Sequence, residues 1–399
     1  MAITLTELLS DCVLKKEEVD RFLDPSQPNW ARFDGEVGYL LRDSFVRDGI
    51  DKSYTLAHYE PTGERRSMLY ADRPCRINTY GDSFTQCQQA SDGETWQTYL
   101  AAHFGEPIRN FGVGGHGAYQ AYRRMLRQEE ITPAPYVILN IFGVDDHVRS
   151  FDRWRWIRIR DFREELRTVA PFYFHGNPWS YARLDLDTGE VKEFPQLCPT
   201  PESLYRLCEF DFVYAAFKDD FQAHITLARE GGKDFDGGML ARMAQAVGVK
   251  PDLTSAEAAA KTARRIQVEY GFAVSKFVVR KAAGFARETG RKLMILLSYD
   301  EGSVAAACKG QARLDQGFVD FLEGEGVAYV DSLVKHVEDF TCFRMAPEQY
   351  VSRYYMGHYR PRGNHFFAFV IKDSLVEWLD PKPVTYSGGA APAKDTANW

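Results

Sequence analysis

The sequence predicts an α/β protein in which strands and helices alternate around a mostly parallel, doubly wound sheet. Short apolar runs at residues 76–80, 107–113 and 136–142 each lie next to a segment with helical spacing. The third run is almost continuously apolar, as expected for a strand that is buried on both faces. The same alternation returns at residues 292–298 and 326–331. In such a sheet, ligands bind at the carboxyl ends of the strands.

The helices are predicted from apolar side chains that recur three and four residues apart. They are expected at residues 95–104, 117–130, 255–289, 312–324 and 364–379. A cap at Thr254 and Ser255, with Glu257 close behind, marks the start of the long third helix. A hairpin is predicted at residues 183–194, with its turn at 187–189.

Three regions are expected along the chain. Residues 1–74 form a helical and mixed N-terminal extension. Residues 75–380 form the α/β domain, which a large insertion interrupts at about 151–290, where the strand–helix rhythm is lost. The tail at 381–399 is rich in Ser, Gly, Ala and Pro, and we expect it to be disordered.

Composition narrows the class of protein. Of the 399 residues, 45% are hydrophobic and 14% aromatic, which is enough for a substantial core. The net charge of −7 argues against bulk nucleic-acid binding, which needs a basic surface. Residues 1–9 lack the basic and apolar regions of a secretory signal, and no stretch approaches the roughly 18 apolar residues of a membrane span. We therefore expect a cytoplasmic protein without a nucleic-acid or membrane partner.

Cysteine usage agrees with this location. The seven cysteines are scattered, odd in number and form no CxxC pair. This pattern argues against both a structural zinc site and a disulfide framework. We expect mostly reduced, buried thiols.

Three polar turns follow predicted parallel strands, at residues 81–83, 110–117 and 143–147. Because the carboxyl ends of parallel strands lie along one edge, the turns should converge. In the first turn, Ser83 lies where a strand passes into a helix, so it could be an exposed nucleophile beside backbone N–H groups that hold an anion. The alternative is that Asp82, Ser83 and Thr85 are an ordinary helix N-cap cluster.

A fourth turn, at residues 358–365, places a histidine just before the last predicted helix. The order of serine, glycine-rich turn and late histidine resembles the SGNH (GDSL-type) hydrolase family, over roughly residues 75–150 and 290–380. The most specific matches are Gly81-Asp82-Ser83-Phe84-Thr85, Asp92-Gly93-Glu94-Thr95-Trp96 and Asn110-Phe111-Gly112-Val113-Gly114-Gly115. The resemblance implies a three-layer α/β/α, flavodoxin-like sheet with a large insertion. It also implies a serine esterase or acyl hydrolase that needs no cofactor.

The family's site maps onto particular residues of this chain. The resemblance implies that Ser83 is the nucleophile and that Ser83 and Gly115 donate backbone N–H groups to the oxyanion. His358, with Gly363 five residues later, is the expected general base, and His365 is the competing candidate. His358 would activate Ser83 for attack on an acyl carbonyl.

Two departures from the family pattern concern this site. Asp145 replaces the usual asparagine donor of the oxyanion hole, and an ionised carboxylate would repel an oxyanion. If Asp145 is functional, its site either keeps the carboxyl protonated or uses the carboxylate to orient a histidine or to bind a cationic group of the substrate. The alternative is that Asp145 is a helix cap or turn residue whose side chain faces solvent.

The second departure lies just before the histidine. The positions of the usual acid hold Tyr355 and Met356. The orientation of His358 would then depend on a backbone carbonyl or on an acid from elsewhere. The candidate acids are Asp145, Asp146 and Asp331.

Arginines crowd the segment after the third turn. They are Arg149, Arg153, Arg155, Arg158, Arg160 and Arg163, interleaved with Phe151, Trp154 and Trp156. Guanidinium groups bind carboxylate, sulfate or phosphate in bidentate fashion, which suggests an anionic substrate held by Arg149 and Arg153. The alternative is a solvated helix face that pairs with Asp152, Asp161 and Glu164.

Further candidates near these turns are Asp146 and His116 for substrate binding. A zinc site from His116, His147 and Asp146 is conceivable, but no ligand spacing supports it. The predicted function is hydrolysis of a small polar ester, and the hypothesis is that this substrate carries a negative charge. The protein could form homo-oligomers. The alternatives are acyl transfer from the same acyl-enzyme, or a binding protein on a decayed hydrolase scaffold.

Overall fold

A five-stranded, all-parallel sheet lies at the centre of the computed structural model, which describes residues 3–26, 30–154, 156–160 and 178–387. Its strands are β5 (Ile77–Tyr80), β6 (Ile108–Asn110), β7 (Tyr136–Phe142), β10 (Lys292–Ser298) and β11 (Ala328–Asp331). Across the sheet the order is β6-β5-β7-β10-β11, so the chain runs 2-1-3-4-5. This is the order of doubly wound, flavodoxin-like sheets, and the predicted α/β class is confirmed.

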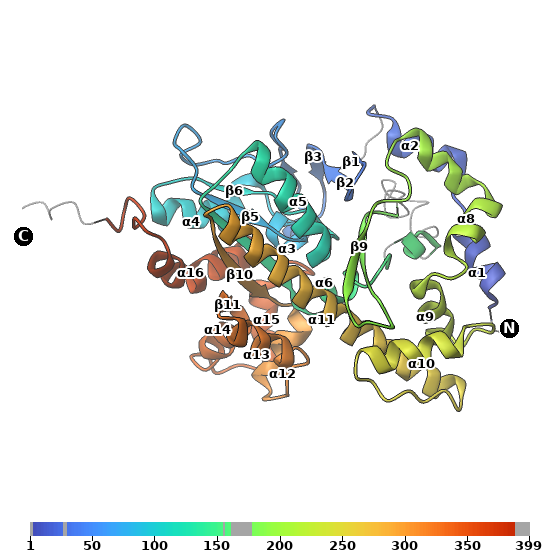
Figure 1. Ribbon diagram of the computed structural model, residues 1–399. Helices are drawn as coiled ribbons and strands as arrows, with labels where there is room; N and C mark the ends of the chain where they lie inside the picture. The colour runs from blue at the N-terminus through green and yellow to red at the C-terminus, as the bar shows by residue number, and fades with distance from the viewer. Residues whose placement is uncertain (1–2, 27–29, 155, 161–177, 388–399) are drawn as a thin grey trace, which may run out of the picture.

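Helices connect the parallel strands and pack on the sheet. The main ones are α4 (Trp96–Phe104), α5 (Ala118–Ile131), α11 (Ala256–Glu288), α13 (Gln316–Glu325) and α16 (Pro361–Trp378). α4 packs against α16, whereas α5 packs against β5, β7 and α11 (Figure 1). Three shorter helices, α12 (Glu301–Cys308), α14 (Ser332–Phe340) and α15 (Pro347–Tyr354), pack together beside β10. None of the helices in the described ranges combines the length and apolar character needed to cross a bilayer.

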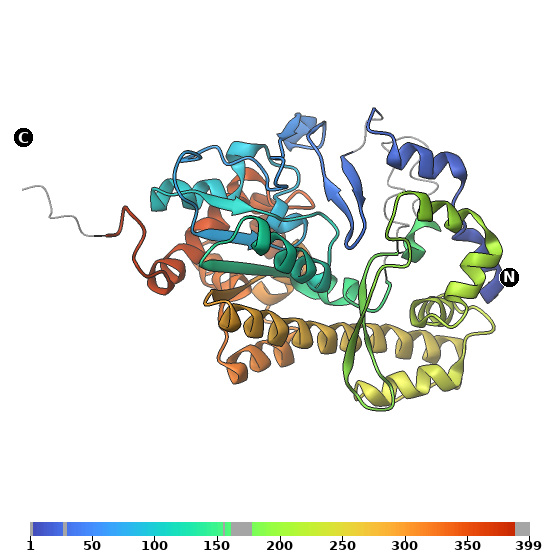
Figure 2. The ribbon, with the colours of Figure 1, turned by 45° about the horizontal axis from the view of Figure 1, so that its top comes forward.

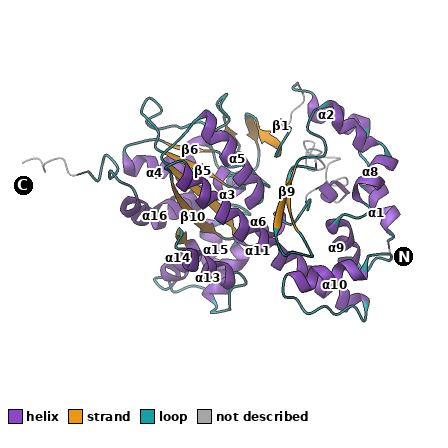
Figure 3. Cartoon of the chain, in the orientation of Figure 1, coloured by secondary structure: helices purple, strands orange, loops and turns teal. Residues whose placement is uncertain are grey.

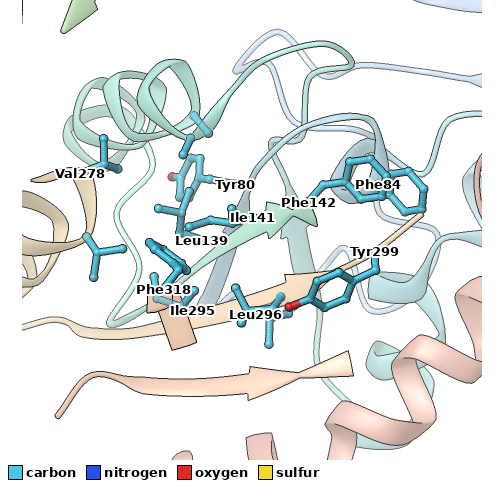
Figure 4. Packing of buried hydrophobic residues seen from close by; sticks show 14 of the residues in the cluster. Tyr80, Phe84, Leu139, Ile141, Phe142, Val278, Ile295, Leu296, Tyr299 and Phe318 are labelled. Carbon is cyan, nitrogen blue, oxygen red and sulfur yellow. The ribbon is translucent and has the colours of Figure 1, made fainter. Parts of the chain in front are cut away.

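The core of the sheet is formed where β7 and β10 pair. Every residue of β7 is buried, as predicted for a strand covered on both faces. Figure 4 shows Leu139 of β7 near Ile295 of β10, with Val278 of α11 nearby. At the carboxyl end of β7, the rings of Phe84 and Phe142 stack with centroids 3.8 Å apart. This packing joins the central strand to the turn that carries Ser83.

A second lobe combines the N-terminal segment with part of the predicted insertion. Its elements are α1 (Leu5–Asp11), α2 (Lys16–Leu23), β1 (Ala31–Asp34), β2 (Gly38–Leu41), η5 (Glu202–Cys208), α8 (Phe210–Phe217) and α9 (Phe221–Arg229). They share a core of their own, in which Leu8 and Tyr39 join Trp179 and Phe217 (Figure 1). The sequence had suggested two separate additions, whereas hydrophobic burial brings them together into one body, here called the second lobe.

The long helix α11 connects the second lobe to the sheet. It spans 33 residues and starts at the predicted cap, where Ser255 accepts a hydrogen bond from the Ala258 amide. α11 packs against α9 and α10 (Gly237–Ala246) in one part and against α5, α6 (Gly143–Arg149) and β10 in another (Figure 2). The helix therefore belongs both to the predicted insertion and to the crossover that joins β7 to β10.

Three smaller features complete the fold. The predicted hairpin is confirmed, with β8 (Tyr181–Leu184) paired antiparallel to β9 (Val191–Phe194). β3 (Ser44–Val46) and β4 (Thr55–Ala57) form a second antiparallel pair. Figure 3 shows the helices and strands of the chain by colour. In the predicted tail, Thr385 donates to the carbonyl of Phe104 in α4, so the tail's first residues pack on the domain. Residues 388–399 lie outside the described ranges.

Candidate active site

The three polar turns meet at the carboxyl edge of the sheet. Ser83 is the first residue of the short helix α3 (Ser83–Gln86), which follows β5. The turn after β6 lies against it, because the Val113 amide donates to the Gly81 carbonyl at 3.0 Å and the Gly114 amide to Gln86 Oε1 at 2.8 Å. The strand order reverses between β5 and β7, where open α/β sheets bind ligands.

Two glycines allow this close approach. Gly81 has φ +155°, and a Cβ there would lie 2.1 Å from Thr85 Oγ1. A Cβ on Gly112 would lie 2.1 Å from the backbone nitrogen of Gln86. A side chain at Gly112 would force the two turns apart, and one at Gly81 would collide with Thr85 in the turn that carries Ser83.

Ser83 and His358 form a hydrogen-bonded pair although 275 positions separate them. Ser83 Oγ lies 2.9 Å from His358 Nε2. The histidine projects from a tight turn just before α16, in which the Met356 amide donates to the His358 carbonyl and Gly357 has φ +94°. The pair has the geometry of a serine hydroxyl and its general base.

Gln89 occupies the place of the missing acid. Its Oε1 lies 2.9 Å from His358 Nδ1 and accepts the His358 backbone N–H at 3.1 Å, while its Nε2 donates to the Asp48 carbonyl at 3.0 Å. A backbone N–H can only donate and a carbonyl can only accept, so these two bonds determine which end of the amide is oxygen. His358 Nδ1 must then carry the proton, which leaves the lone pair of Nε2 facing Ser83.

A buried arginine supports the loop that carries Gln89. The guanidinium of Arg65 donates to the carbonyls of Gln86, Cys87 and Ala90 and to Asp92 Oδ1, at 2.6 to 3.1 Å. Gln89 itself has a left-handed backbone with φ +67°. Arg65 thus ties together both sides of a strained turn. Gln89 and Arg65 were not predicted from the sequence, since neither belongs to a recognisable motif.

His358 is uncharged at neutral pH in this setting. Burial, and secondarily the positive charge of Arg149, lower its pKa to about 4. A neutral carboxamide at Gln89 does not oppose this shift as a carboxylate would. The imidazole can therefore accept a proton from Ser83 at neutral pH.

Arg149 lies on the other side of Ser83, among three carboxylates. Its Nη1 is 3.2 Å from Asp82 Oδ2 and 3.1 Å from Asp146 Oδ1, and its Nη2 is 3.2 Å from Asp145 Oδ2. Burial raises the pKa of both Asp82 and Asp146, and repulsion from Asp82 raises that of Asp146 further. The guanidinium offsets part of this cost. Asp82 Oδ2 also lies 3.2 Å from Ser83 Oγ, so it connects Arg149 to the serine.

The structure distinguishes the alternative roles that the sequence predicted for Asp82 and Asp145. Asp82 is the N-cap of α3 and accepts the Phe84 amide, so a cap and a candidate nucleophile occur side by side. Asp145 lies in the first turn of α6 with its side chain 65% exposed and paired with Arg149. This is the solvent-facing alternative, and among the described residues no hydrogen bond or ion pair joins Asp145 to His358.

Backbone amides are the remaining candidates for the oxyanion hole. The Ser83 N–H is the first of its helix, so helix geometry gives it no intrahelical acceptor. The Gly115 N–H makes no hydrogen bond to any residue of the described ranges. Gly114, next to it, lies so close that a Cβ there would be 3.6 Å from Ser83 Cβ.

Other predicted site residues lie elsewhere. Arg153 donates to the Tyr181 hydroxyl at 3.0 Å and stacks on Phe217, inside the second lobe. His116 is fully buried, with its ring against Tyr39 and Trp179, so its placement gives no support for direct substrate contact. Arg155, Arg163, Asp161 and Glu164 lie outside the described residues.

The remaining candidate acids and histidines make contacts of their own. Asp146 accepts the Phe142 amide beside Arg149, and Asp331 pairs with Arg313. His365 is exposed on α16 and packs on Tyr99, whereas His147 packs between Phe272 and Phe318. Within the described ranges, no three His, Cys, Asp or Glu side chains are grouped so that they could hold a metal.

No protein-family model matches the chain, and no curated protein is significantly similar to it. One solved structure, described as a candidate lipolytic protein of the G-D-S-L family from Desulfitobacterium hafniense DCB-2, is 14% identical. The match covers 34% of this chain and 97% of that one, with a TM-score of 0.18. With so low a TM-score, the match carries no argument about function.

Proposed function

We propose that this protein is a serine hydrolase of the SGNH type that cleaves an acyl ester through a covalent Ser83 intermediate. The observation that carries the proposal is the 2.9 Å contact between Ser83 Oγ and a His358 Nε2 whose lone pair is available. A serine hydroxyl is a weak nucleophile until a base accepts its proton, and this contact supplies the base. The glycine-rich turn beside it supplies backbone donors.

The steps of the reaction follow from this arrangement. Ser83 Oγ bonds to the acyl carbon while its proton passes to His358 Nε2, and the amides of Ser83 and Gly115 stabilise the oxyanion. The tetrahedral intermediate collapses, the ester C–O bond breaks, and the imidazolium gives its proton to the leaving alcohol. Water, deprotonated by the same nitrogen, then releases the acid and restores Ser83.

Gln89 changes how the histidine would work. Its amide oxygen orients the ring as an aspartate would, but it does not add a negative charge beside the imidazolium. The charged intermediate is therefore stabilised less, and we expect slower turnover than with a carboxylate. The same observation favours the second candidate, a binding protein on a hydrolase scaffold.

Labelling and hydrolysis measurements separate the two candidates. The full chain is incubated with a fluorophosphonate probe and with p-nitrophenyl acetate, alongside Ser83→Ala and, as matched control, Ser352→Ala on the exposed face of α15. The hydrolase proposal expects labelling and ester cleavage that only Ser83→Ala abolishes. Labelling that persists in Ser83→Ala contradicts the nucleophile assignment, and no labelling of the parent protein favours the binding protein.

A further inference from the structure

A buried histidine, His336, contacts both ends of the turn that carries His358. It belongs to α14 (Ser332–Phe340), is fully buried, and takes no part in the proposed reaction. Burial lowers its pKa to about 3, so the ring is neutral at pH 7. A buried neutral imidazole has one donor and one acceptor, and both need partners.

The Nε2 side of this ring contacts the tyrosines that flank the base. Tyr355 and Tyr359 pair as an antiparallel bridge, with His358 between them in the chain. Their hydroxyls lie 3.1 and 3.0 Å from His336 Nε2 and 3.1 Å from each other. Both tyrosines are buried. A single nitrogen of α14 therefore joins the end of α15 to the start of α16 across the turn.

The Nδ1 side of the ring is a donor, because a carboxylate lies at the edge of the cluster. The Tyr350 hydroxyl lies 3.1 Å from His336 Nδ1 and 2.9 Å from Asp339 Oδ2. A carboxylate only accepts, so Tyr350 gives its single proton to Asp339 and its oxygen accepts from His336 Nδ1. Since the neutral ring carries one N–H, its Nε2 must be the acceptor.

Tyr355 uses its own proton elsewhere. Its hydroxyl donates at 3.0 Å to the carbonyl of Tyr299, which follows β10 directly (Figure 4). His336 Nε2 is then left to accept from Tyr359. These bonds tie the turn both to the carboxyl end of β10 and to α14. Tyr355 occupies one position of the family's acid, and in this chain its hydroxyl supports the turn.

The position of this turn determines where the base meets the serine. The Tyr359 ring packs edge-on against Phe84 with centroids 5.2 Å apart, and the His358 ring lies 5.2 Å from the same phenyl ring. Phe84 follows Ser83 in α3, so both rings pack on the helix that carries the serine. Gly363 makes room for this packing, since a Cβ there would lie 2.6 Å from Tyr359 Cδ1. A shift of Tyr359 would therefore move His358 relative to Ser83.

We propose that His336 is a positioning residue, which holds the hydroxyls of Tyr355 and Tyr359 and thereby keeps His358 within hydrogen-bonding distance of Ser83. This inference rests on the proposed function, since it concerns the base of the same site. Loss of the acceptor would leave hydroxyls without a partner in a buried cluster, which is costly. The turn would then relax, and a displacement of about 1 Å can lower a rate by about 10²-fold.

Removal of the two hydroxyls tests the network and keeps the aromatic rings in place. In Tyr355→Phe/Tyr359→Phe, kcat for p-nitrophenyl acetate should fall by about tenfold with KM little changed. The matched control is Tyr354→Phe, which loses a hydroxyl bonded to Asp339 and keeps the bonds between the turn and His336. Thermal unfolding measures the stability that each variant has lost. An unchanged kcat in the double variant, or an equal fall in Tyr354→Phe, would overturn the inference.

Two substitutions of His336 examine the ring itself. His336→Leu removes both the donor and the acceptor, whereas His336→Gln keeps an amide oxygen that can accept from Tyr359. The value of kcat should fall by about tenfold or more in His336→Leu and recover in part in His336→Gln. An equal loss in both variants would contradict the role of the acceptor. If His336→Leu does not fold, the tyrosine variants carry the test.

Titration of His358 by NMR separates a failure of this inference from a failure of the proposed function. Burial is the main cause that lowers the pKa of His358 to about 4. A loosened turn would admit water and raise this pKa by about one unit or more. The histidine signals of the isotope-labelled full chain are followed against pH, and His358→Gln identifies the relevant signal.

The outcomes of this titration are distinct. A raised pKa in Tyr355→Phe/Tyr359→Phe but not in Tyr354→Phe, in a protein that cleaves no ester, would support the positioning role and contradict the hydrolase. Ser83-dependent cleavage in which the double variant changes neither kcat nor the pKa of His358 would contradict the positioning role alone.

Discussion

The two sides of Ser83 differ in how their side chains are held. On one side, Gln89 and His358 are held by bonds to the backbone and by a buried loop that Arg65 ties together. On the other side, Arg149 faces carboxylates and a cavity lined by further arginines from α9 and α11. On the first side, a neutral amide holds the histidine through hydrogen bonds. The second side is charged, with one guanidinium placed among three carboxylates.

The two sides of Ser83 are also built by different parts of the fold. The groups placed to touch the reacting atoms come from turns at the carboxyl edge of the α/β sheet. The cavity is formed where α9 of the second lobe meets α6 and α11. The candidate catalytic groups and this cavity therefore come from different parts of the chain, so substitutions should affect them separately.

The largest effect is expected from removing the base. His358→Ala should lower kcat for p-nitrophenyl acetate by about 10³-fold, because Ser83 loses its proton acceptor. The comparison is His365→Ala, whose exposed ring on α16 lies outside the site and should have little effect. A larger loss in His365→Ala than in His358→Ala would reverse the assignment of the base.

A large effect on stability is expected on the charged side. Arg149→Gln leaves the buried carboxylates of Asp82 and Asp146 without their cation, which should lower the free energy of unfolding by about 3–5 kcal/mol at pH 7. The pKa values of both carboxyls are raised in the folded protein, so protonation at lower pH should shrink the difference. Urea unfolding at pH 7 and pH 5 measures this, with Arg280→Gln as the surface control. A loss of stability that does not depend on pH would contradict the explanation.

The pH dependence tests the neutral side. With the pKa of His358 at about 4, the acid limb of kcat/KM should lie near that value, because activity is lost only when the histidine takes a proton. Gln89→Glu puts a carboxylate next to Nδ1 and stabilises the imidazolium, so the limb should move to higher pH by about one unit or more. Gln88→Glu places the same charge one residue away and should move it less. A limb that stays in place in Gln89→Glu would show that Gln89 does not hold the histidine during the reaction.

The smallest effect is expected at Asp145. Because its side chain is mostly exposed and pairs with Arg149 at the surface, Asp145→Asn should change kcat for p-nitrophenyl acetate by no more than about threefold. A rise well above this would mean that an amide at this position donates to the oxyanion, as in the family that the sequence resembles. Steady-state kinetics beside the parent protein decides between the two.

Local pattern was enough to predict the strands at the centre of the sheet, the long helix after Ser255 and the turn that carries Ser83. These features follow from apolar periodicity, capping and glycine placement, which act over a few residues. The approach of His358 to Ser83 was expected from a family resemblance and not from spacing. Their roles in catalysis stay predictions.

Long-range packing decided the rest. The second lobe joins residues near the N-terminus to residues some 200 positions later through hydrophobic burial, which no local pattern encodes. Gln89 meets His358 across 269 positions, and its identity as a neutral amide could not be inferred from a search for acids. The neighbours of each arginine likewise depended on where α9 and α11 lie, so only the tertiary structure separated Arg149, at the site, from Arg153, in a core. Sequence determined the sheet edge at which the chemistry is placed, and tertiary structure determined the partners, because those contacts join segments that meet only after the chain has folded.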